Sequence, residues 1–254
     1  MRQYEAVEVI SNAILEENLV ESIFLKGSLA RSSEDVYSNI DLYVIVQEAK
    51  LNLFLERQLK ILRKYEVIVY SKVEENQLTV VFENGILLNF YTLLPNELDY
   101  YDDMVVIHDP KGLLENYKKI DLEYSPAEVG ELLDKFLLTS IEFHNSYKRE
   151  DIIYSFYLAS DMFKHLGIFI RIKYDPKYAK LGLKHFILDS DEASGIREKY
   201  IDIARKLKIN SVLECVKMIY VLLDNYINNI PILFAEYINF DFYAYTKRKI
   251  MSIN

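Results

Sequence analysis

A Gly-Ser turn and a few short side chains with oxygen atoms form a pattern that is typical of phosphate and metal binding. Gly27 and Ser28 follow an apolar run, and Asn39 stands two residues before Asp41 at the start of the next one. Backbone N–H groups at such a turn can face a phosphate. Carboxylate and amide oxygens are ligands of hard cations. The pattern predicts a pocket for phosphate and metal, with an amide where a second carboxylate would be expected.

Asn89 is the third candidate side chain, and it lies in the apolar run that follows Glu83-Asn84-Gly85. Residues two apart on a strand project from the same face of a sheet, so Asn39 and Asp41 should point the same way. If the strands of Asp41 and Asn89 are neighbours, these side chains meet. We therefore expect all three to face the turn at 27 and 28.

The elements that must position these residues alternate between helical and strand periodicity in the first half of the chain. The hydrophobic spacing predicts helices at 2–18 and 49–65 and strands at 20–25, 40–46, 66–73, 77–82, 86–94 and 105–110, the last at a sheet edge. Asn84-Gly85 between two apolar runs predicts a hairpin with a type I′ turn. A mixed sheet flanked by helices is expected.

Only helices are predicted after this sheet. Ser125-Pro126-Ala127-Glu128 is a capping box with proline at the first helical position. The expected helices cover 126–147, 151–173, 177–188, 192–207 and 211–228, the last opened by a second box at Ser211 and Glu214. The predicted fold class is α+β, with a sheet domain at 1–123 and an all-α helical bundle at 124–254.

Composition limits the classes of function. No apolar run among the 254 residues is long enough for a membrane span, and the net charge of −9 argues against nucleic acid as the main partner. The one cysteine, Cys215, excludes an intrachain disulfide. A single cysteine, together with the lack of a signal-peptide pattern at the N-terminus, favours a cytoplasmic protein. Cys215 is expected to be a small core residue on a helix.

The order of these motifs resembles a known family. A Gly-Ser turn, a variable loop, a strand of the form acid-hydrophobic-acid and a later strand with a third acid are the signature of the nucleotidyltransferase fold related to DNA polymerase beta. VVFENGILLNFYTLLPNEL is similar to the stretch of aminoglycoside 6-adenylyltransferases in which an E-D/N-G turn leads to the third carboxylate, and VVIHDPKGLLENY also looks like that family. The resemblance is sharpest over 25–98 and implies a nucleotidyltransferase-type sheet domain.

The resemblance implies a reaction and roles for the candidate residues. The family transfers a nucleoside monophosphate from a nucleoside triphosphate, with Mg²⁺, to a hydroxyl of a small molecule, often an aminoglycoside-like antibiotic. Carried over, Gly27 and Ser28 would cradle the phosphates, Asn39 and Asp41 would be the metal pair, and Asn89 would take the place of the base. In such two-metal chemistry, carboxylates hold the ions and one accepts the proton of the nucleophile.

The sequence departs from this pattern at two of the three acids. An amide oxygen can bind a metal, but it carries no charge and cannot accept a proton at neutral pH. Two unit charges about 4 Å apart interact by about 4 kcal/mol at an effective dielectric of about 20. Losing two carboxylate charges should therefore weaken metal binding by several kcal/mol. Asp41 would be the remaining metal ligand, and transfer should be impaired. Lys26 and Arg31 could hold phosphates in place of metal.

Other interpretations of single residues stay open. Asn39 could be a strand-entry residue, and Asn89 an ordinary polar position on an exposed sheet face. Glu34 and Asp35 are loop acids that could substitute for the missing ones, and His108 near a strand end could approach the cleft.

Two functions follow from the sequence. One is an impaired nucleotidyltransferase that acts on a small hydroxylated molecule. The alternative is a catalytically inactive pseudoenzyme that binds a nucleotide, a small ligand or a protein partner. A helical RNase domain is disfavoured, because the C-terminal half lacks an Arg-polar-x-x-x-x-His motif.

Overall fold

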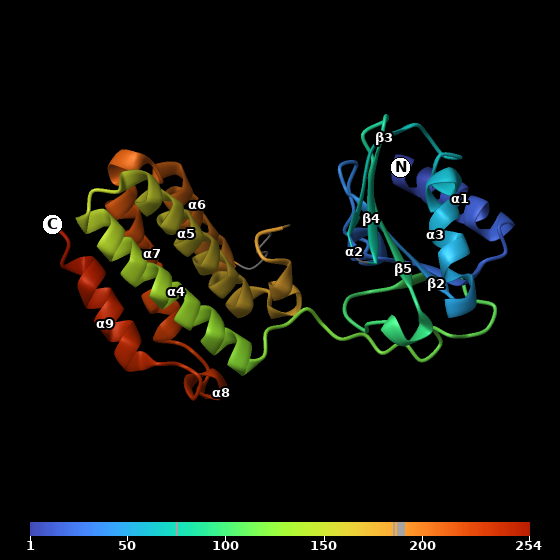
Figure 1. The fold of residues 1–254 in the computed structure, drawn as a ribbon. Coiled ribbons are helices and arrows are strands. Elements are labelled where there is room, and N and C mark those ends of the chain that lie inside the picture. Colours follow the sequence, from blue (N-terminus) through green and yellow to red (C-terminus); the bar gives the residue numbers. More distant parts are fainter. Residues whose placement is uncertain (75, 185, 187–190) are drawn as a thin grey trace. The chain divides into compact units, whose positions relative to one another are not determined.

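The computed structural model describes residues 1–74, 76–184, 186 and 191–254. The chain forms two compact units, a sheet unit at 1–120 and a helical unit at 121–254. The sheet unit holds a mixed six-stranded sheet with helices, and the helical unit consists of packed helices (Figure 1). The predicted α+β class is confirmed. In the described part of the chain, no helix is both long enough and apolar enough to cross a bilayer.

The sheet runs in the order β3-β4-β5-β2-β1-β6. Its strands are β1 (Val20–Lys26), β2 (Ile40–Val46), β3 (Ile68–Glu74), β4 (Gln77–Phe82), β5 (Leu87–Leu93) and β6 (Val105–His108). Only β2 and β5 pair in parallel, and the other neighbours are antiparallel. The strand predicted at 105–110 is an edge strand, beside β1.

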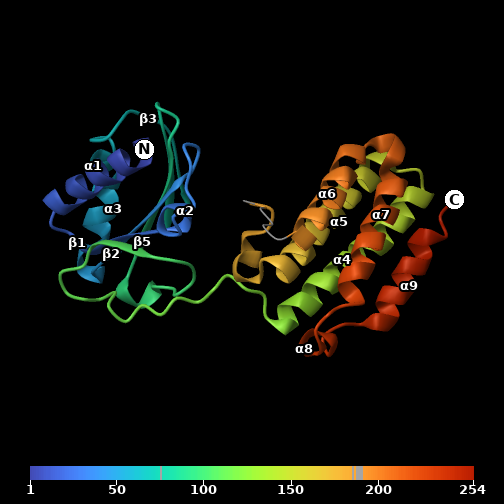
Figure 2. The same cartoon turned by 180° about the vertical axis from the view of Figure 1, so that it is seen from behind.

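One face of this sheet is covered by two helices. α1 (Arg2–Glu16) and α3 (Glu48–Leu62) pack against it and against each other, as both views show (Figures 1 and 2). Along β4, buried residues alternate with half-buried ones, and Leu78, Val80 and Phe82 join the core beneath these helices. The other face therefore carries the polar positions of β2, β4 and β5, among them the candidate residues.

The hairpin between β4 and β5 is present, but its turn is not type I′. The N–H of Phe82 donates to the carbonyl of Ile86 at 3.0 Å, which leaves three residues in the loop. Gly85 has a φ of +85°, whereas Asn84 has no positive φ. The Asn84 side chain instead accepts a bond from the N–H of Ile86 at 3.1 Å, so only the glycine takes the left-handed conformation.

The helical unit encloses a core of its own. Its helices are α4 (Pro126–Lys148), α5 (Ile152–Tyr174), α6 (Asp191–Lys206), α7 (Val212–Ile227), α8 (Ile232–Ala235) and α9 (Phe240–Met251). Phe136, Phe169 and Tyr220 are fully buried and in ring contact within that core. Cys215 is buried on α7, as predicted.

The first predicted capping box is confirmed and the second is wrong. Ser125 Oγ accepts from the N–H of Glu128 at 3.3 Å, and Glu128 Oε2 accepts from the N–H of Ser125 at 2.7 Å. Ser211 makes no cap bond to α7, because its hydroxyl donates to the carbonyl of Lys206 at 2.5 Å.

The helix predicted at 177–188 is also wrong over its described part. That stretch contains the short 3₁₀ segment η2 (Pro176–Leu181), which ends at Gly182 with a φ of +63°. A residue with positive φ cannot continue a right-handed helix, so the segment stops there. Residues 185 and 187–188 of this prediction lie outside the described residues.

Candidate functional site

Asp41 and Asn89 meet on the face of the sheet opposite α1 and α3. They are register partners on the parallel strands β2 and β5, and the Asn89 amide Nδ2 donates to Asp41 Oδ1 at 2.7 Å. Both side chains are half-buried. The sequence analysis left open whether these two strands are neighbours. They are, and their pairing places an amide donor directly against the one carboxylate of the predicted triad.

Two residues of β4 extend this contact, and the sequence analysis missed them. Gln77 Nε2 donates to Asn89 Oδ1 at 3.1 Å and to Thr79 Oγ1 at 3.0 Å. Thr79 lies opposite Asn89 in the antiparallel register of β4 and β5. The hairpin turn is the sequence signal that could have identified these two residues, because its position fixes which residues of β4 face Asn89.

The Gly27-Ser28 turn touches the same carboxylate. Gly27 begins the one-turn helix α2 (Gly27–Ala30) directly after β1 and has a φ of +74°. A Cβ atom built on Gly27 would fall well inside van der Waals contact of Asp41 Oδ2 and 3.2 Å from Asp41 Cγ. Only glycine allows this approach. Ser28 is buried beside it, so the turn and Asp41 form one tight corner.

No hydrogen bond joins the Asn39 side chain to this corner among the residues that the structure describes. Asn39 stands just before β2, its side chain is exposed, and that side chain makes no hydrogen bond to any other residue that the structure describes. Its position two residues before Asp41 places it at the open end of the strand. The structure therefore brings Asp41, Asn89 and the Gly27-Ser28 turn together and leaves Asn39 at their margin.

Lys26 is committed to an internal partner. The side chain is buried, and its Nζ donates to Asp99 Oδ1 at 2.5 Å and to the Asp99 carbonyl at 3.1 Å. The ammonium also lies 5.4 Å and 5.5 Å from the ring centres of Tyr43 and Tyr117. Cations at such distances are attracted by the ring faces.

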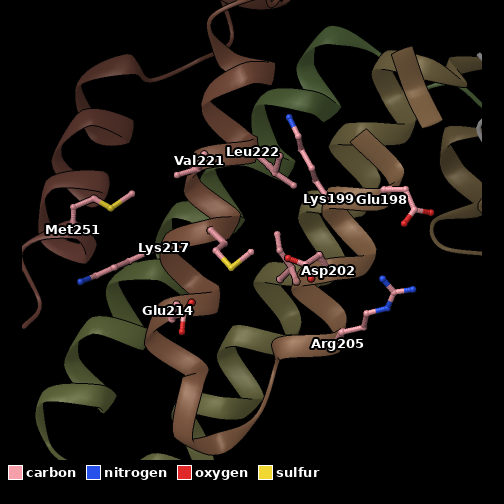
Figure 3. A pocket seen from close by; sticks show the side chains of 11 residues that line it. Glu198, Lys199, Asp202, Arg205, Glu214, Lys217, Val221, Leu222 and Met251 are labelled. Carbon is pink, nitrogen blue, oxygen red and sulfur yellow. The ribbon is translucent and has the colours of Figure 1, made fainter. Parts of the chain in front are cut away.

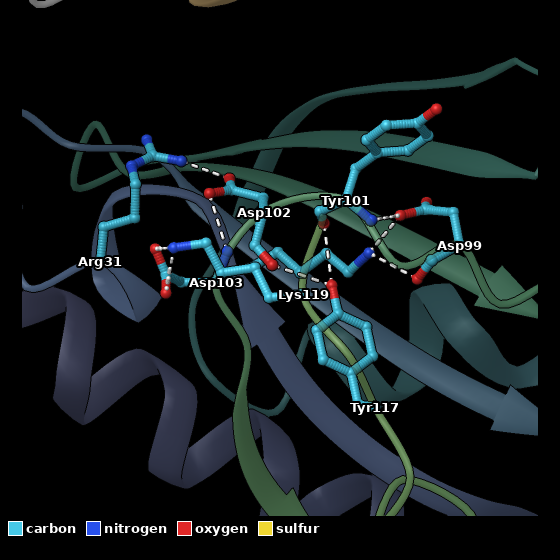
Figure 4. A network of polar contacts seen from close by, with 8 residues as sticks. Arg31, Asp99, Tyr101, Asp102, Asp103, Tyr117 and Lys119 are labelled. Carbon is cyan, nitrogen blue, oxygen red and sulfur yellow. Dashed lines mark hydrogen bonds and ion pairs between the residues drawn. The ribbon is translucent and has the colours of Figure 1, made fainter. Parts of the chain in front are cut away.

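Arg31 is paired in the same way. Its guanidinium forms an ion pair with Asp102, and both side chains are nearly buried. Next to this pair, Lys119 Nζ lies 2.8 Å from Asp103 Oδ2, and the Tyr117 hydroxyl donates to the carbonyl of Asp102 at 2.9 Å (Figure 4). The two cations predicted to receive phosphate are thus neutralised by acids of the segment after β5.

An aromatic stack lies beside the polar corner on the same face of the sheet. Tyr43 on β2 stacks on Tyr91 of β5 with 4.3 Å between ring centres, and on Phe24 of β1 at 5.1 Å. Burial raises the pKa of Tyr43, and the neighbouring Tyr91 and Asp41 raise it further. The Tyr43 hydroxyl accordingly stays protonated at neutral pH.

The residues present do not fit a two-ion magnesium centre. Among the described residues, no three His, Cys, Asp or Glu side chains gather in a group that could hold a metal. Asp41 is the only carboxylate of the corner, and it faces the nitrogen of the Asn89 amide rather than its oxygen. Mg²⁺ requires a near-octahedral set of oxygen ligands, which this arrangement does not offer.

The other acids named from the sequence have structural roles. Glu34 accepts a hydrogen bond from the Tyr4 hydroxyl at 2.5 Å, and Asp35 Oδ1 accepts one from the N–H of Tyr37 at 2.8 Å. Both therefore order the loop after α2.

His108 lies on the edge strand β6, and its neighbour Asp109 has a structural role. His108 ends β6 opposite Ile23, whereas Asp41 lies opposite Lys26, three residues further along β1. The Asp109 carboxylate accepts hydrogen bonds from the Ser22 hydroxyl at 2.8 Å and from the N–H of Leu114 at 2.8 Å. It therefore stabilises the turn that follows.

The helical unit has a hollow of its own. A groove of about 600 Å³ lies along α6 and α7, with Met251 of α9 at its end (Figure 3). Met218, Val221 and Leu222 supply apolar surface, and charged side chains of α6 and α7 stand at the rim. None of the candidate site residues lines this groove.

Comparisons with known proteins find a similarity in structure and none in sequence. No family model matches the sequence, and no curated protein matches it. Among solved structures, the chain is similar to the crystal structure of an aminoglycoside 6-adenyltransferase from Bacillus subtilis. The identity is 14%, the match covers 96% of this chain and 97% of the other, and the TM-score is 0.40.

Proposed function

We propose that this chain is a nucleotidyltransferase-like protein that binds a nucleotide in the corner formed by Gly27, Ser28, Asp41 and Asn89 and has lost magnesium-dependent transfer. The observation that carries the proposal is the 2.7 Å hydrogen bond from Asn89 to Asp41. In the resembling family, carboxylates at these positions share metal ions. Here residue 89 is an amide, and its NH₂ donates a hydrogen bond to the Asp41 carboxylate.

The paired cations limit the affinity that we expect for a nucleotide. Lys26 forms an ion pair with Asp99, and Arg31 forms one with Asp102. A phosphate group must therefore displace one of these carboxylates before it can pair with either cation. Such an exchange leaves the net charge of the corner negative, which weakens the binding of a polyanion. We therefore expect weak nucleotide binding that does not depend on Mg²⁺.

Calorimetric titration with ATP and with GTP, each with and without Mg²⁺, tests this proposal. Equal affinity in both conditions, and no transfer of the radiolabelled α-phosphate to an aminoglycoside, are the expected results. Asp102→Asn should strengthen ATP binding by releasing Arg31, whereas Asp103→Asn, a matched change next to it, should not. The complete absence of nucleotide binding in all these proteins would refute the proposal.

A residual transferase is the second candidate function, and the retained contact between Asp41 and the Gly27 turn favours it. Restoring both acids with Asn39→Asp and Asn89→Asp should create Mg²⁺-dependent triphosphate binding, followed by transfer to a small hydroxylated acceptor. A double variant that behaves as the parent protein would contradict our placement of the site.

A further inference from the structure

A small hollow lies on the helix-covered side of the sheet, where α3 passes the start of β4 and the end of β5. Its volume is about 80 Å³. Gln58 of α3, Leu78 of β4 and Thr92 of β5 line it, together with Glu97 of the 3₁₀ segment η1 (Pro95–Glu97). None of the four residues of the proposed nucleotide corner lines this hollow. It is therefore a separate place in the sheet unit.

Gln58 and Thr92 are polar where the neighbouring positions are apolar. The other buried residues of α3 are all hydrophobic, and on β5 Thr92 follows Leu88 and Phe90 on one face of the strand. The exposed fractions of Gln58 and Thr92 are only 8% and 6%. An apolar residue at either position would continue the core, so the sequence places two polar groups against the hollow.

These two polar groups have no partner in the fold. Neither side chain makes a hydrogen bond to any residue in the described part of the chain. Their polar atoms are not sealed inside the core but border the hollow. Burying a polar group without a partner destabilises a protein, so a molecule in the hollow is expected to supply the missing hydrogen bonds.

Glu97 adds a negative charge at the same place. Its Oε2 accepts a hydrogen bond from the N–H of Leu94 at 2.8 Å, and its carboxylate forms no ion pair with any residue that the structure describes. A carboxylate accepts several hydrogen bonds, so Glu97 retains free acceptor capacity. With the Gln58 carbonyl oxygen and the Thr92 hydroxyl, it offers three acceptors, which is the number that an ammonium group with three donors requires.

Apolar side chains supply much of the remaining wall, namely those of Leu51, Leu55, Val73 and Leu78. The hollow has room for more than one water-sized group, and water against this wall would leave hydrogen bonds unmade. A bare metal ion would gain nothing from the apolar wall. We propose that the hollow binds a primary ammonium group on a short alkyl stem, carried either by a free alkylamine or by a lysine side chain.

Titration of the full chain with n-propylammonium tests this proposal, with the backbone N–H resonances of Leu78 and Thr92 followed by nuclear magnetic resonance. Saturable shifts are expected. 1-Propanol has the same length but no charge, and it should bind about tenfold more weakly, because hydrogen bonds between charged partners are the stronger ones. Nα-acetyl-lysine methylamide distinguishes the two sources, since it binds as well as n-propylammonium only if the hollow accepts a lysine side chain.

Two variants remove different parts of the site. Gln58→Leu removes one acceptor and fills the hollow, and Glu97→Gln removes the charge alone. Each should weaken n-propylammonium binding about tenfold. Glu83→Gln is the matched control, because Glu83 is an exposed acid beyond the other end of β4 and does not line the hollow. Its affinity should stay within about twofold of the parent.

Saturable binding that is weakened in Gln58→Leu and Glu97→Gln but not in Glu83→Gln supports the proposal. Shifts that do not saturate, equal affinity for 1-propanol, or an unchanged affinity in both variants would overturn it and leave water as the occupant of the hollow. The titration contains no nucleotide, so its outcome is independent of the proposed function.

Discussion

The α-carbon of Gly27 lies directly against the carboxylate of Asp41, so close that no side chain fits between them. The contact joins the turn after β1 to the neighbouring strand β2, where Lys26 and Asp41 are register partners. Gly27 also has a φ of +74°, which side chains other than glycine adopt at a cost. One residue thus sets both the shape of the turn and the depth of the corner.

Replacing this glycine separates steric contact from backbone strain. Gly85 has a similar φ of +85° but open space around its α-carbon, so Gly85→Ala adds strain alone. We expect Gly85→Ala to lower the free energy of unfolding by about 1 kcal/mol and Gly27→Ala by about 2–4 kcal/mol, as measured by urea denaturation. Equal losses in the two variants would show that the contact with Asp41 costs nothing.

The ion pair of Arg31 and Asp102 allows a test of a nearly buried charge. Asp102 has a φ of +74°, which asparagine tolerates, so Asp102→Asn changes little besides the charge. Leaving the Arg31 charge without this carboxylate should cost about 2–3 kcal/mol of unfolding free energy. Asp103→Asn removes a more exposed partner of Lys119 and should cost less than about 1 kcal/mol.

A double variant checks the origin of that loss. Arg31→Met together with Asp102→Asn removes both charges and should recover more than half of the stability lost in Asp102→Asn. If the double variant is less stable than the single one, the Arg31 side chain contributes mainly through its other contacts.

The capping box at the start of α4 should make stability depend on pH. A hydrogen bond from Lys180 and another from the N–H of Ser125 lower the pKa of Glu128 from 4.5 to about 2. Between these values the unfolded chain binds more protons, so the stabilisation is present above about pH 4.5 and is lost as the pH falls toward 2.

This pH effect is small, because the Glu128 side chain is 41% exposed and solvent screens its charge. Glu128→Gln should lower the free energy of unfolding by about 0.5–1 kcal/mol near pH 7. Near pH 2 the variant and the parent should be equally stable. Urea denaturation at both pH values measures the difference, and a constant gap between the two proteins would contradict the assignment.

Cys215 should report unfolding of the helical unit. It is the one cysteine of the chain and is fully buried, and burial raises the pKa of its thiol. Since the thiolate is the reactive form, the native protein should react with a disulfide reagent far more slowly than the urea-unfolded chain. Rapid native labelling at the unfolded rate would show that this part of α7 opens readily.

Local sequence patterns were enough to predict several elements and the residue types of the candidate site. Hydrophobic periodicity is local, so it located β2 at 40–46 and β4 at 77–82 with their observed bounds. The capping box at Ser125 and Glu128 was equally visible, since both partners lie within one turn. The amides at 39 and 89 were likewise readable, and with them the expectation that they replace two carboxylates of the resembling family.

Tertiary structure alone decided which groups these residues contact. Lys26 and Asp99 are 73 residues apart, and Arg31 and Asp102 are 71 apart, so no local pattern indicated that the phosphate candidates are already paired. The contact between Gln77 and Asn89 likewise depends on the register of β4 and β5, which lie 12 residues apart at these positions. Local sequence encodes conformation, whereas a side chain's partners depend on how distant strands are aligned, which is a property of the whole sheet.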